Sequence, residues 1–226
     1  IDPQQRLFLQ AAWHAMEDAG ITPEQLDGER CSVFVGYNFV DYSQRLMRQN
    51  LASEAYSYTG NASPILPARI SYLLNLKGPG IALNTACSSS MVAVHLACDS
   101  IRCGTSRLAL AGGAQVMTTG QFHVLADSLG MSAKDGKCKT FDHRADGFVP
   151  GEAVGVVLLK SLSQARADGD PIHGIIIGSA VNQDGRTNGI TAPSAPSQTA
   201  LVCEVYDRFG IHPETIGYVE AHGTGT

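Results

Sequence analysis

The sequence predicts a layered α/β fold in which helices cover a largely buried sheet. Short apolar runs typical of strands alternate along the chain with segments whose apolar residues follow the helical period. Several runs are apolar at nearly every position, which is typical of strands buried on both faces. Glycine is frequent, with 24 residues among 226, and it often stands between the runs, where tight turns are needed.

The N-terminal part predicts two helices, one strand and a stretch without a clear pattern. Asp2 is placed to cap the first helix, Pro3 fits its first turn, and Gly20 ends its apolar stripe. A short helix from Thr22 and a strand over 31–37 follow. Residues 38–60 show no clear pattern and are not assigned.

The rest of the chain continues this alternation. Its patterns predict a helix over 65–74, a strand over 81–86, a helix from Ser88 to Gly104, a strand over 108–117, a charged loop over 130–148, buried strands over 153–159 and 172–181, a helix over 196–208 and a final strand over 216–221. No repeat and no linker divides the chain, so one domain, or most of a larger one, is expected.

The composition argues against several classes of function. The formal net charge is −5, and its 16 basic and 21 acidic residues are interspersed, so no nucleic-acid-binding face is expected. The uncharged stretches 78–98 and 108–126 contain glycine and polar residues, and they are interpreted as buried segments of a protein without a membrane span. Residues 130–138 resemble a phosphate-binding loop, but the spacing of the glycines and the final cysteine do not fit, so no nucleotide is expected.

The cysteines indicate a reducing environment. Six cysteines form no CxxC pair and have no histidine-rich partner spacing, so neither a metal site nor a redox motif is predicted. Mostly free thiols and a cytoplasmic location are expected. The chain begins at Ile1 without a signal peptide, and it is interpreted as a piece of a longer polypeptide.

Cys87 is the strongest candidate for a catalytic residue because it lies where a predicted strand meets a predicted helix. The small residues 85–90 around it permit a tight, strained turn that presents the thiol. The N-terminus of the following helix favours the thiolate, and its free N–H groups could stabilise an oxyanion. A buried, unreactive cysteine is the alternative, and position alone does not decide between the two.

His222 is the second candidate. It follows a predicted strand, and Gly223 and Gly225 leave room for a substrate beside its ring. A neutral imidazole there could donate a hydrogen bond or carry a proton. A structural loop histidine is the alternative, and Cys87 is what favours the functional interpretation. His14 and His95 lie on predicted helices and are interpreted as structural.

Several motifs along the whole chain give it a family resemblance. They are residues 2–6 (DPQQR), 69–72 (RISY), 78–79 (GP), 85–90 (TACSSS), 111–113 (AGG), 145–148 (ADGF), 182–185 (NQDG) and 220–226 (EAHGTGT). Together and in this order, they resemble the ketosynthase domain of modular polyketide synthases, which belongs to the β-ketoacyl-acyl carrier protein synthases of the thiolase-like superfamily.

The resemblance implies a function for both candidates. Cys87 would take an acyl chain from the phosphopantetheine arm of an acyl carrier protein as a thioester. A malonyl-type extender on another carrier would be decarboxylated, and its carbanion would attack that thioester to give a β-ketoacyl product. His222 would support decarboxylation and stabilise the enolate. Acyl carrier protein, other polyketide synthase domains and a second copy of the parent protein are the implied partners, and no cofactor or metal is bound directly.

The resemblance also implies a thiolase-like αβαβα fold, of which residues 1–226 hold the first half and the start of the second. The family's second catalytic histidine and its lysine lie downstream of the HGTGT motif, so the chain is expected to be a partial, inactive ketosynthase domain ending after this motif. Apolar surface that the rest of the domain and a dimer partner would cover is expected to be exposed.

Two other interpretations stay open on the sequence. One is a thiolase, which also uses a cysteine at such a turn but exchanges acyl groups with free coenzyme A. The other is a non-catalytic, ketosynthase-like protein. The serines after Cys87 and the HGTGT motif argue against a thiolase, and the presence of both Cys87 and His222 argues against a non-catalytic role.

Overall fold

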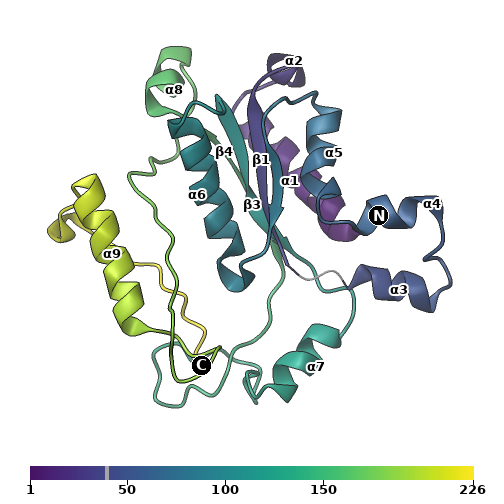
Figure 1. The fold of residues 1–226 in the computed structure, drawn as a ribbon, viewed down its shortest axis with the longest axis vertical. Helices are drawn as coiled ribbons and strands as arrows, with labels where there is room; N and C mark the ends of the chain where they lie inside the picture. Colours follow the sequence, from purple (N-terminus) through teal and green to yellow (C-terminus); the bar gives the residue numbers. More distant parts are fainter. Residues whose placement is uncertain (39–40) are drawn as a thin grey trace. The chain divides into compact units, whose positions relative to one another are not determined.

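The computed structural model describes residues 1–38 and 41–226. They form two compact units, one of residues 1–171 and 222–226 and the other of residues 172–221. The first unit contains a sheet with helices on both faces, which confirms the predicted α/β layers (Figure 1).

The sheet of the first unit has four strands in the order β2-β1-β3-β4. Their bounds are Cys31–Tyr37 for β1, Gly80–Leu83 for β2, Leu108–Gln115 for β3 and Ala153–Lys160 for β4. β1 is parallel to β2 and β3, with Val33 opposite Gly80 on one side and Leu110 on the other. β4 is antiparallel to β3. The carboxyl ends of β1, β2 and β3 therefore lie at one edge of the sheet.

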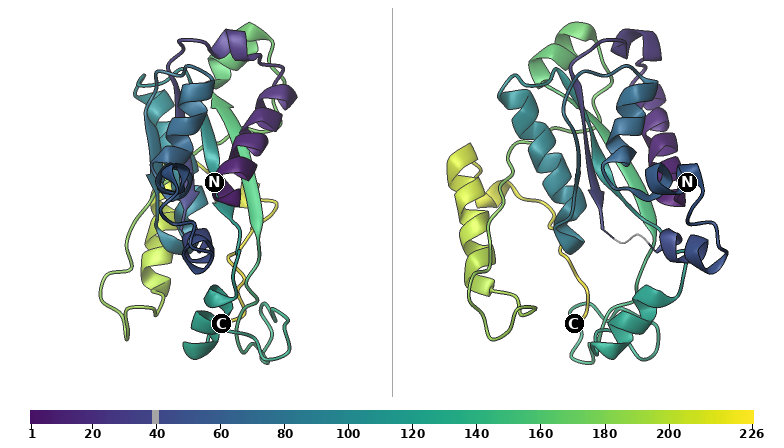
Figure 2. Two further views of the ribbon diagram at one scale, coloured as in Figure 1. Left: turned by 90° about the vertical axis from the view of Figure 1, so that its right-hand side faces the viewer. Right: turned by 45° about the vertical axis from the view of Figure 1, so that its right-hand side comes forward.

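The helices connect and cover these strands. In chain order they are α1 (Pro3–Asp18), α2 (Pro23–Leu26), α3 (Tyr42–Arg48), α4 (Ala55–Asn61), α5 (Ile65–Leu73), the 3₁₀ turn η1 (Ala86–Ser88), α6 (Ser89–Arg102), α7 (Gln121–Ser128), α8 (Leu162–Asp168), α9 (Ala195–Phe209) and the 3₁₀ turn η2 (Pro213–Thr215). Figures 1 and 2 show α1 and α6 on opposite faces of the sheet.

Each face of the sheet has its own apolar cluster. On one face, residues of β1 such as Val33 and Val35 pack with Phe8 of α1 and with α5. On the other face, Phe34 and small residues of β3 pack against Ala93 of α6. All seven residues of β1 are buried, which confirms that its continuous apolar run is a strand covered on both sides. Burying each large side chain contributes about 1.5–3 kcal/mol to folding.

Asp2 connects the start of α1 to the sheet. Its carboxylate accepts hydrogen bonds from the Gln4 backbone N–H at 2.7 Å and from the Tyr37 hydroxyl at 3.1 Å, which confirms the predicted helix cap. Gln4 Oε1 in turn accepts the backbone N–H of Val116 at 3.0 Å. Burial raises the pKa of Asp2, and burial together with the neighbouring Asp2 charge raises the pKa of Tyr37. The polar residues of the DPQQR motif therefore hold α1 to β1 and to the end of β3.

Asp41 joins the segments that follow β1 and β3. Its buried carboxylate accepts the backbone N–H groups of Thr118 (3.1 Å) and Thr119 (2.6 Å) and both threonine hydroxyls. Burial alone would raise the pKa of Asp41, but these four hydrogen bonds outweigh it and hold the pKa below its usual value. The carboxylate is therefore ionised in the native state and holds together two connections at the carboxyl edge of the sheet.

Several predicted boundaries shift, and some elements were missed. The strand predicted over 81–86 is β2, which ends at Leu83 because the chain then enters a tight turn. The unassigned range 38–60 contains α3 and α4, and its residues 39–40 lie outside the described residues. Helices α7 and α8 were also missed, since eight and seven residues give too little of a helical period to recognise.

Two strand predictions are wrong. Neither 172–181 nor 216–221 forms a strand, although both have strand-like composition. A strand needs a hydrogen-bonded neighbour, and neither segment joins the described four-stranded sheet. Both belong to the second unit, and they are not buried as predicted: Ile177 is 63% exposed and Val219 is 73% exposed.

The second unit is organised around α9. The Ser194 side chain caps this helix by accepting the backbone N–H of Ser197, and Gly210 ends it in the left-handed conformation. Gly178 approaches the ring of Phe209 so closely that a Cβ atom would lie 2.3 Å from it. This contact fixes segment 172–181 against the C-terminal end of α9.

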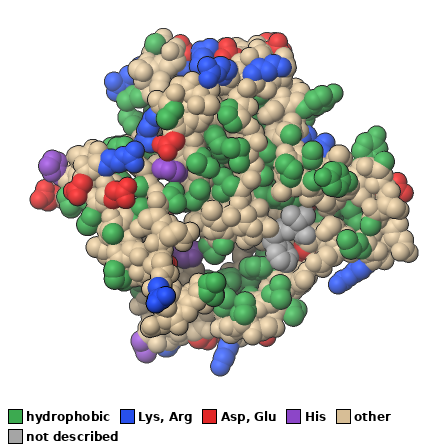
Figure 3. All heavy atoms as spheres, in the orientation of Figure 1, with side chains coloured by type: hydrophobic (Ala, Val, Ile, Leu, Met, Phe, Trp, Pro, Cys, Tyr) green, Lys and Arg blue, Asp and Glu red, His purple; other side chains and the backbone are tan. Residues whose placement is uncertain are grey.

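Large apolar side chains reach the surface at many points, as the space-filling view shows (Figure 3). They include Tyr72 and Leu73 on α5 and Ile175 in the second unit. The expectation of extensive exposed apolar surface is therefore confirmed. In the described part of the chain, no helix has both the length and the apolar character needed to cross a membrane.

We predict that Asp41→Asn destabilises the protein by about 1–3 kcal/mol at pH 7, because an amide cannot accept all four hydrogen bonds. The native pKa of Asp41 lies below the model-peptide value of 3.8, so the stabilisation is present above that pH and is lost as the pH falls through the native pKa. Urea unfolding of both proteins between pH 7 and pH 3 should show the difference shrinking with acidity.

The matched control for this comparison is Asp127→Asn, on the exposed surface of α7. Its effect should stay within about 0.5 kcal/mol. A destabilisation by Asp41→Asn that is the same at every pH would contradict the role assigned to the carboxylate charge.

Candidate active site

Cys87 lies in a strained turn between β2 and α6, within the 3₁₀ turn Ala86–Ser88. Ala86 has a φ of 55°, in the left-handed region that residues with a Cβ atom rarely adopt. This conformation costs about 1–2 kcal/mol. Cys87 follows directly and is exposed to solvent. The predicted strained turn is therefore present, and Cys87 is not buried among the described residues.

Two serines after Cys87 hold the strained turn in place. The buried Ser89 hydroxyl accepts the backbone N–H of Thr85 at 2.9 Å and donates to the Ala86 carbonyl at 2.7 Å. The Ser88 hydroxyl donates to the Thr85 carbonyl at 2.9 Å. These bonds span the residue with positive φ, so they offset the strain that it introduces.

Two glycines bring the start of α6 directly onto the sheet. A Cβ atom on Gly36, near the end of β1, would lie 2.7 Å from the Ser89 carbonyl carbon. A Cβ atom on Gly113, near the end of β3, would lie 2.9 Å from Ser90 Cβ. From the sequence alone, no packing role is predicted for these two glycines. The sequence does contain a signal for this close packing. A glycine lies near the end of the predicted strand before Cys87, and another lies near the end of the predicted strand after it.

The first turn of α6 presents partial positive charge beside Cys87. The first backbone N–H groups of a helix have no partner within the helix, and the helix dipole is positive at this end. In the described structure, no side chain caps α6 at Ser88. The Ser89 N–H donates to the Ala86 carbonyl, and the other N–H groups of this first turn are suited to hold an oxyanion that forms near Cys87. The predicted preference for the thiolate stays a prediction.

The other cysteines are distinguished by burial. All six lie within the described residues and are free, which confirms the predicted free thiols. Burial raises the pKa of Cys31 to about 12, and burial also raises the pKa of Cys98. These two thiols are held in the unreactive protonated form.

His222 lies in the turn 222–226, which belongs to the first unit together with the loop 139–147. Its side chain is exposed. The Thr140 hydroxyl donates to the Gly223 carbonyl at 2.5 Å, and the Gly147 N–H donates to the Gly225 carbonyl at 3.1 Å. The segments 139–147 and 222–226 therefore lie in contact.

Cys87 and His222 belong to the same unit without being hydrogen-bonded to each other. Figures 1 and 2 show the C-terminus beyond the end of the sheet at which α6 begins. Among the described residues, no hydrogen bond joins Cys87 to the His222 ring. The structure thus places both candidates in exposed positions, where each is accessible to a substrate. Of the two helical histidines interpreted as structural, His95 pairs with Asp99 within α6 at 3.3 Å.

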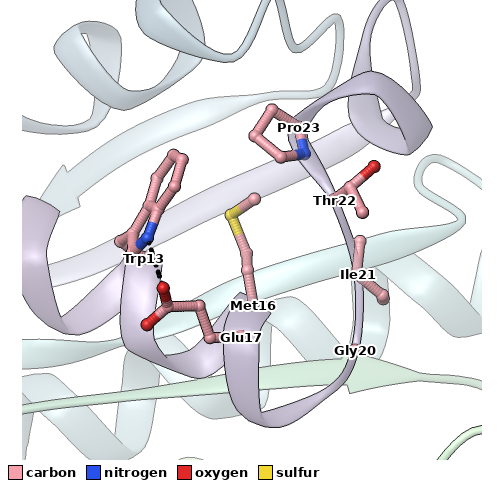
Figure 4. Close-up of a pocket in the computed structure, with 7 residues that line it drawn as sticks. All are labelled: Trp13, Met16, Glu17, Gly20, Ile21, Thr22 and Pro23. Atoms are coloured by element: carbon pink, nitrogen blue, oxygen red, sulfur yellow. Dashed lines mark hydrogen bonds between the residues drawn. The ribbon is translucent and has the colours of Figure 1, made fainter.

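A separate hollow of about 300 Å³ lies between α1 and α2 and does not involve either candidate. Figure 4 shows its lining, in which Trp13 Nε1 donates to Glu17 beside Met16 and Pro23. Among the described residues, no group of three or more histidine, cysteine, aspartate or glutamate side chains is arranged to hold a metal ion.

Comparison with known families identifies the class of protein that this fold and cysteine turn define. Residues 1–165 match the family described as "Beta-ketoacyl synthase, N-terminal domain", and residues 173–226 match "Beta-ketoacyl synthase, C-terminal domain". The chain belongs to the β-ketoacyl synthase family.

Proteins with similar sequences include polyketide synthases. The chain is 48% identical over 226 residues to a phenolphthiocerol/phthiocerol polyketide synthase of Mycobacterium tuberculosis, covering 100% of this chain and 15% of that protein. It is 50% identical to polyketide synthase PksL of Bacillus subtilis, covering 100% of this chain and 5% of that protein.

Solved ketosynthase structures share the fold. The ketosynthase from module 6 of the bacillaene synthase of Bacillus subtilis matches with a TM-score of 0.92 and 48% identity, covering 100% of this chain and 38% of that one. An oxazolomycin ketosynthase domain of Streptomyces albus matches with a TM-score of 0.94 and 40% identity. This match covers 100% of the present chain and 40% of that domain's chain. The predicted thiolase-like fold and the predicted resemblance to polyketide synthase ketosynthases are confirmed.

We predict that Ser89→Ala lowers the free energy of unfolding by about 1–3 kcal/mol, because it leaves the Thr85 N–H without its acceptor and removes one of the two donors to the Ala86 carbonyl. Urea denaturation measures this change, and the rate at which iodoacetamide modifies Cys87 reports on the turn itself. Ser128→Ala, at an exposed serine of α7, is the matched control and should change stability by less than about 0.5 kcal/mol. Equal effects of the two substitutions would show that Ser89 does not brace the turn.

Proposed function

We propose that this chain is part of a ketosynthase that extends an acyl chain by decarboxylative Claisen condensation during polyketide synthesis. The observation that carries the proposal is the exposed Cys87 on a strained turn at the start of α6, in a chain of the β-ketoacyl synthase family. The chain spans 38% of the solved bacillaene ketosynthase, so the activity is proposed for the full-length protein.

The first step is transfer of an acyl group to Cys87. The thiolate attacks the carbonyl carbon of an acyl thioester and forms a new bond between carbon and Sγ. The pantetheine sulfur leaves and takes up the proton that the cysteine gave up. Backbone N–H groups at the start of α6 hold the oxyanion while the tetrahedral intermediate exists. The strained, exposed turn leaves Sγ accessible to a substrate carried on a long arm.

The second step is condensation with the extender. The bond to the malonyl carboxylate breaks, CO₂ leaves, and the electron pair forms an enolate whose charge lies on the thioester oxygen. A His222 N–H donates a hydrogen bond to that oxygen as the charge develops. The enolate carbon then attacks the Cys87 thioester, a carbon–carbon bond forms, and the Cys87 thiolate is released. Dividing the reaction at one sulfur replaces one difficult step with two easier ones.

The proposal includes the molecules that the reaction requires. Both substrates would arrive on the phosphopantetheine of acyl carrier proteins, and the chain would need no cofactor or metal of its own. Other polyketide synthase domains are the expected neighbours, as in the relatives, and a second copy of the protein would cover part of the exposed apolar surface.

We predict that Cys87→Ser abolishes acyl loading and condensation in the full-length protein, because serine lacks an ionisable thiol. Mass spectrometry of the protein after incubation with an acetyl-N-acetylcysteamine thioester measures loading, and the β-ketoacyl product measures condensation. Cys103→Ser, at the exposed cysteine that follows α6, is the matched control and should retain both. Persistence of the acetyl adduct in Cys87→Ser would overturn the proposal.

The role of His222 has its own test. His222→Ala should leave acyl loading within about twofold of the wild type and lower CO₂ release from a malonyl-loaded carrier protein by roughly 10²-fold or more, as expected for loss of a group that stabilises developing charge. Unchanged CO₂ release would show that His222 does not take part.

A further inference from the structure

Apart from a 2.8 Å hydrogen bond between the Thr224 and Thr226 hydroxyls, the backbone of the turn that carries His222 is not fixed by its own residues. Gly223 has a φ of 59° and Gly225 has a φ of 74°, and both glycines lie directly beside or near the histidine. Glycine adopts positive and negative φ about equally well, so neither residue holds the turn in one conformation by steric exclusion. The direction of the imidazole therefore depends on contacts that the turn makes with other parts of the chain.

Those contacts come from one loop. The Thr140 hydroxyl donates to the Gly223 carbonyl at 2.5 Å, and the Gly147 N–H donates to the Gly225 carbonyl at 3.1 Å. A Cβ atom on Gly225 would lie 3.0 Å from the Lys139 backbone nitrogen, so the two backbones are in close contact. The loop 139–147 thus fixes the turn at the carbonyls of both glycines.

The loop 139–147 is itself held by ion pairs and by close backbone contacts. Lys139 Nζ forms ion pairs with Asp135 at 2.8 Å and Asp146 at 2.5 Å, and only 17% of the Lys139 side chain is exposed. Gly147 is buried with a φ of 146°, and a Cβ atom there would lie 2.5 Å from the Ser132 carbonyl carbon. The residue that follows, Phe148, pairs with the backbone on either side of Ser132. Because the loop 139–147 is fixed at both ends, it can hold the turn 222–226 in place.

Thr140 makes its contact through a side chain, whereas Gly147 uses backbone. The carbonyl that Thr140 holds belongs to the residue immediately after His222, so this bond restricts the backbone angles that set the direction of the ring. We propose that Thr140 is a positioning residue for His222, acting on condensation through the Gly223 carbonyl. This inference rests on the role proposed for His222. The inference predicts an effect on condensation but none on acyl transfer to Cys87, because acyl transfer does not use the imidazole.

The test compares Thr140→Val and Thr140→Ala with Thr140→Ser in the full-length protein. Loading of Cys87 is measured with an acetyl-N-acetylcysteamine thioester, and CO₂ release is measured with a malonyl-loaded carrier protein. Removing the hydroxyl should lower kcat for CO₂ release by roughly five- to tenfold, which corresponds to one neutral hydrogen bond, and should leave loading within about twofold. Thr140→Ser keeps the donor and should restore CO₂ release to within about twofold of the wild type.

Thr105→Val is the matched control, since Thr105 is also exposed but lies beyond the C-terminal end of α6. It should change neither measurement. If Thr140→Val and Thr140→Ala leave CO₂ release unchanged while His222→Ala lowers it, the inference is wrong and the proposed function stands. If they lower loading and CO₂ release equally, Thr140 has a general structural role, and the inference is also wrong. Unchanged CO₂ release in His222→Ala would remove the proposed function of His222 and this inference with it.

Discussion

The close approach of α6 to the sheet is the constraint on which the candidate site depends. Gly36 and Gly113 leave no side chain between the strand ends and the first turn of the helix, so Ser89 and Ser90 lie directly against the backbone. The chain has to leave β2 and enter this helix within a few residues, and it does so through a left-handed alanine. Cys87 follows this alanine and is exposed. One packing requirement thus determines the strain, the position of the sulfur and the direction of the helix N–H groups.

The polar interactions around the sheet hold the connections between its elements. Asp2 holds the first helix to β1 and Asp41 holds the segments after β1 and β3, each through a buried carboxylate. The two carboxylates differ in the balance between burial and hydrogen-bond donors, and this balance decides the direction of each pKa shift. Asp41 has four donors and keeps a lowered pKa, whereas burial of Asp2 outweighs its donors and raises the pKa. Loops at the carboxyl edge of the sheet are therefore fixed by an ionised group, which suits the edge where the candidate residues lie.

Local patterns were enough to predict the α/β layers, the cap at Asp2 and the turn at Cys87, because each depends on residues close together in the sequence. The roles of Gly36 and Gly113 could not be predicted in the same way, since they depend on which helix crosses the strand ends. The strands predicted over 172–181 and 216–221 failed for a related reason. Their composition favours extended backbone, but a strand also requires a partner that no local pattern specifies. His222 was predicted to follow a strand over 216–221 that does not form, and the contact of its turn with Thr140 was missed because the two residues lie 82 positions apart in the sequence.

Segment 172–181 has a consequence for how the protein is made. It contains four isoleucines, and Ile175 and Ile177 are more than half exposed. A short, β-prone, uncharged segment of this kind binds readily to identical segments of other chains and so promotes aggregation. On the ribosome, the four strands of the sheet emerge before this segment does, so the sheet can close while the isoleucines are still in the exit tunnel. Aggregation through this segment should therefore increase with protein concentration.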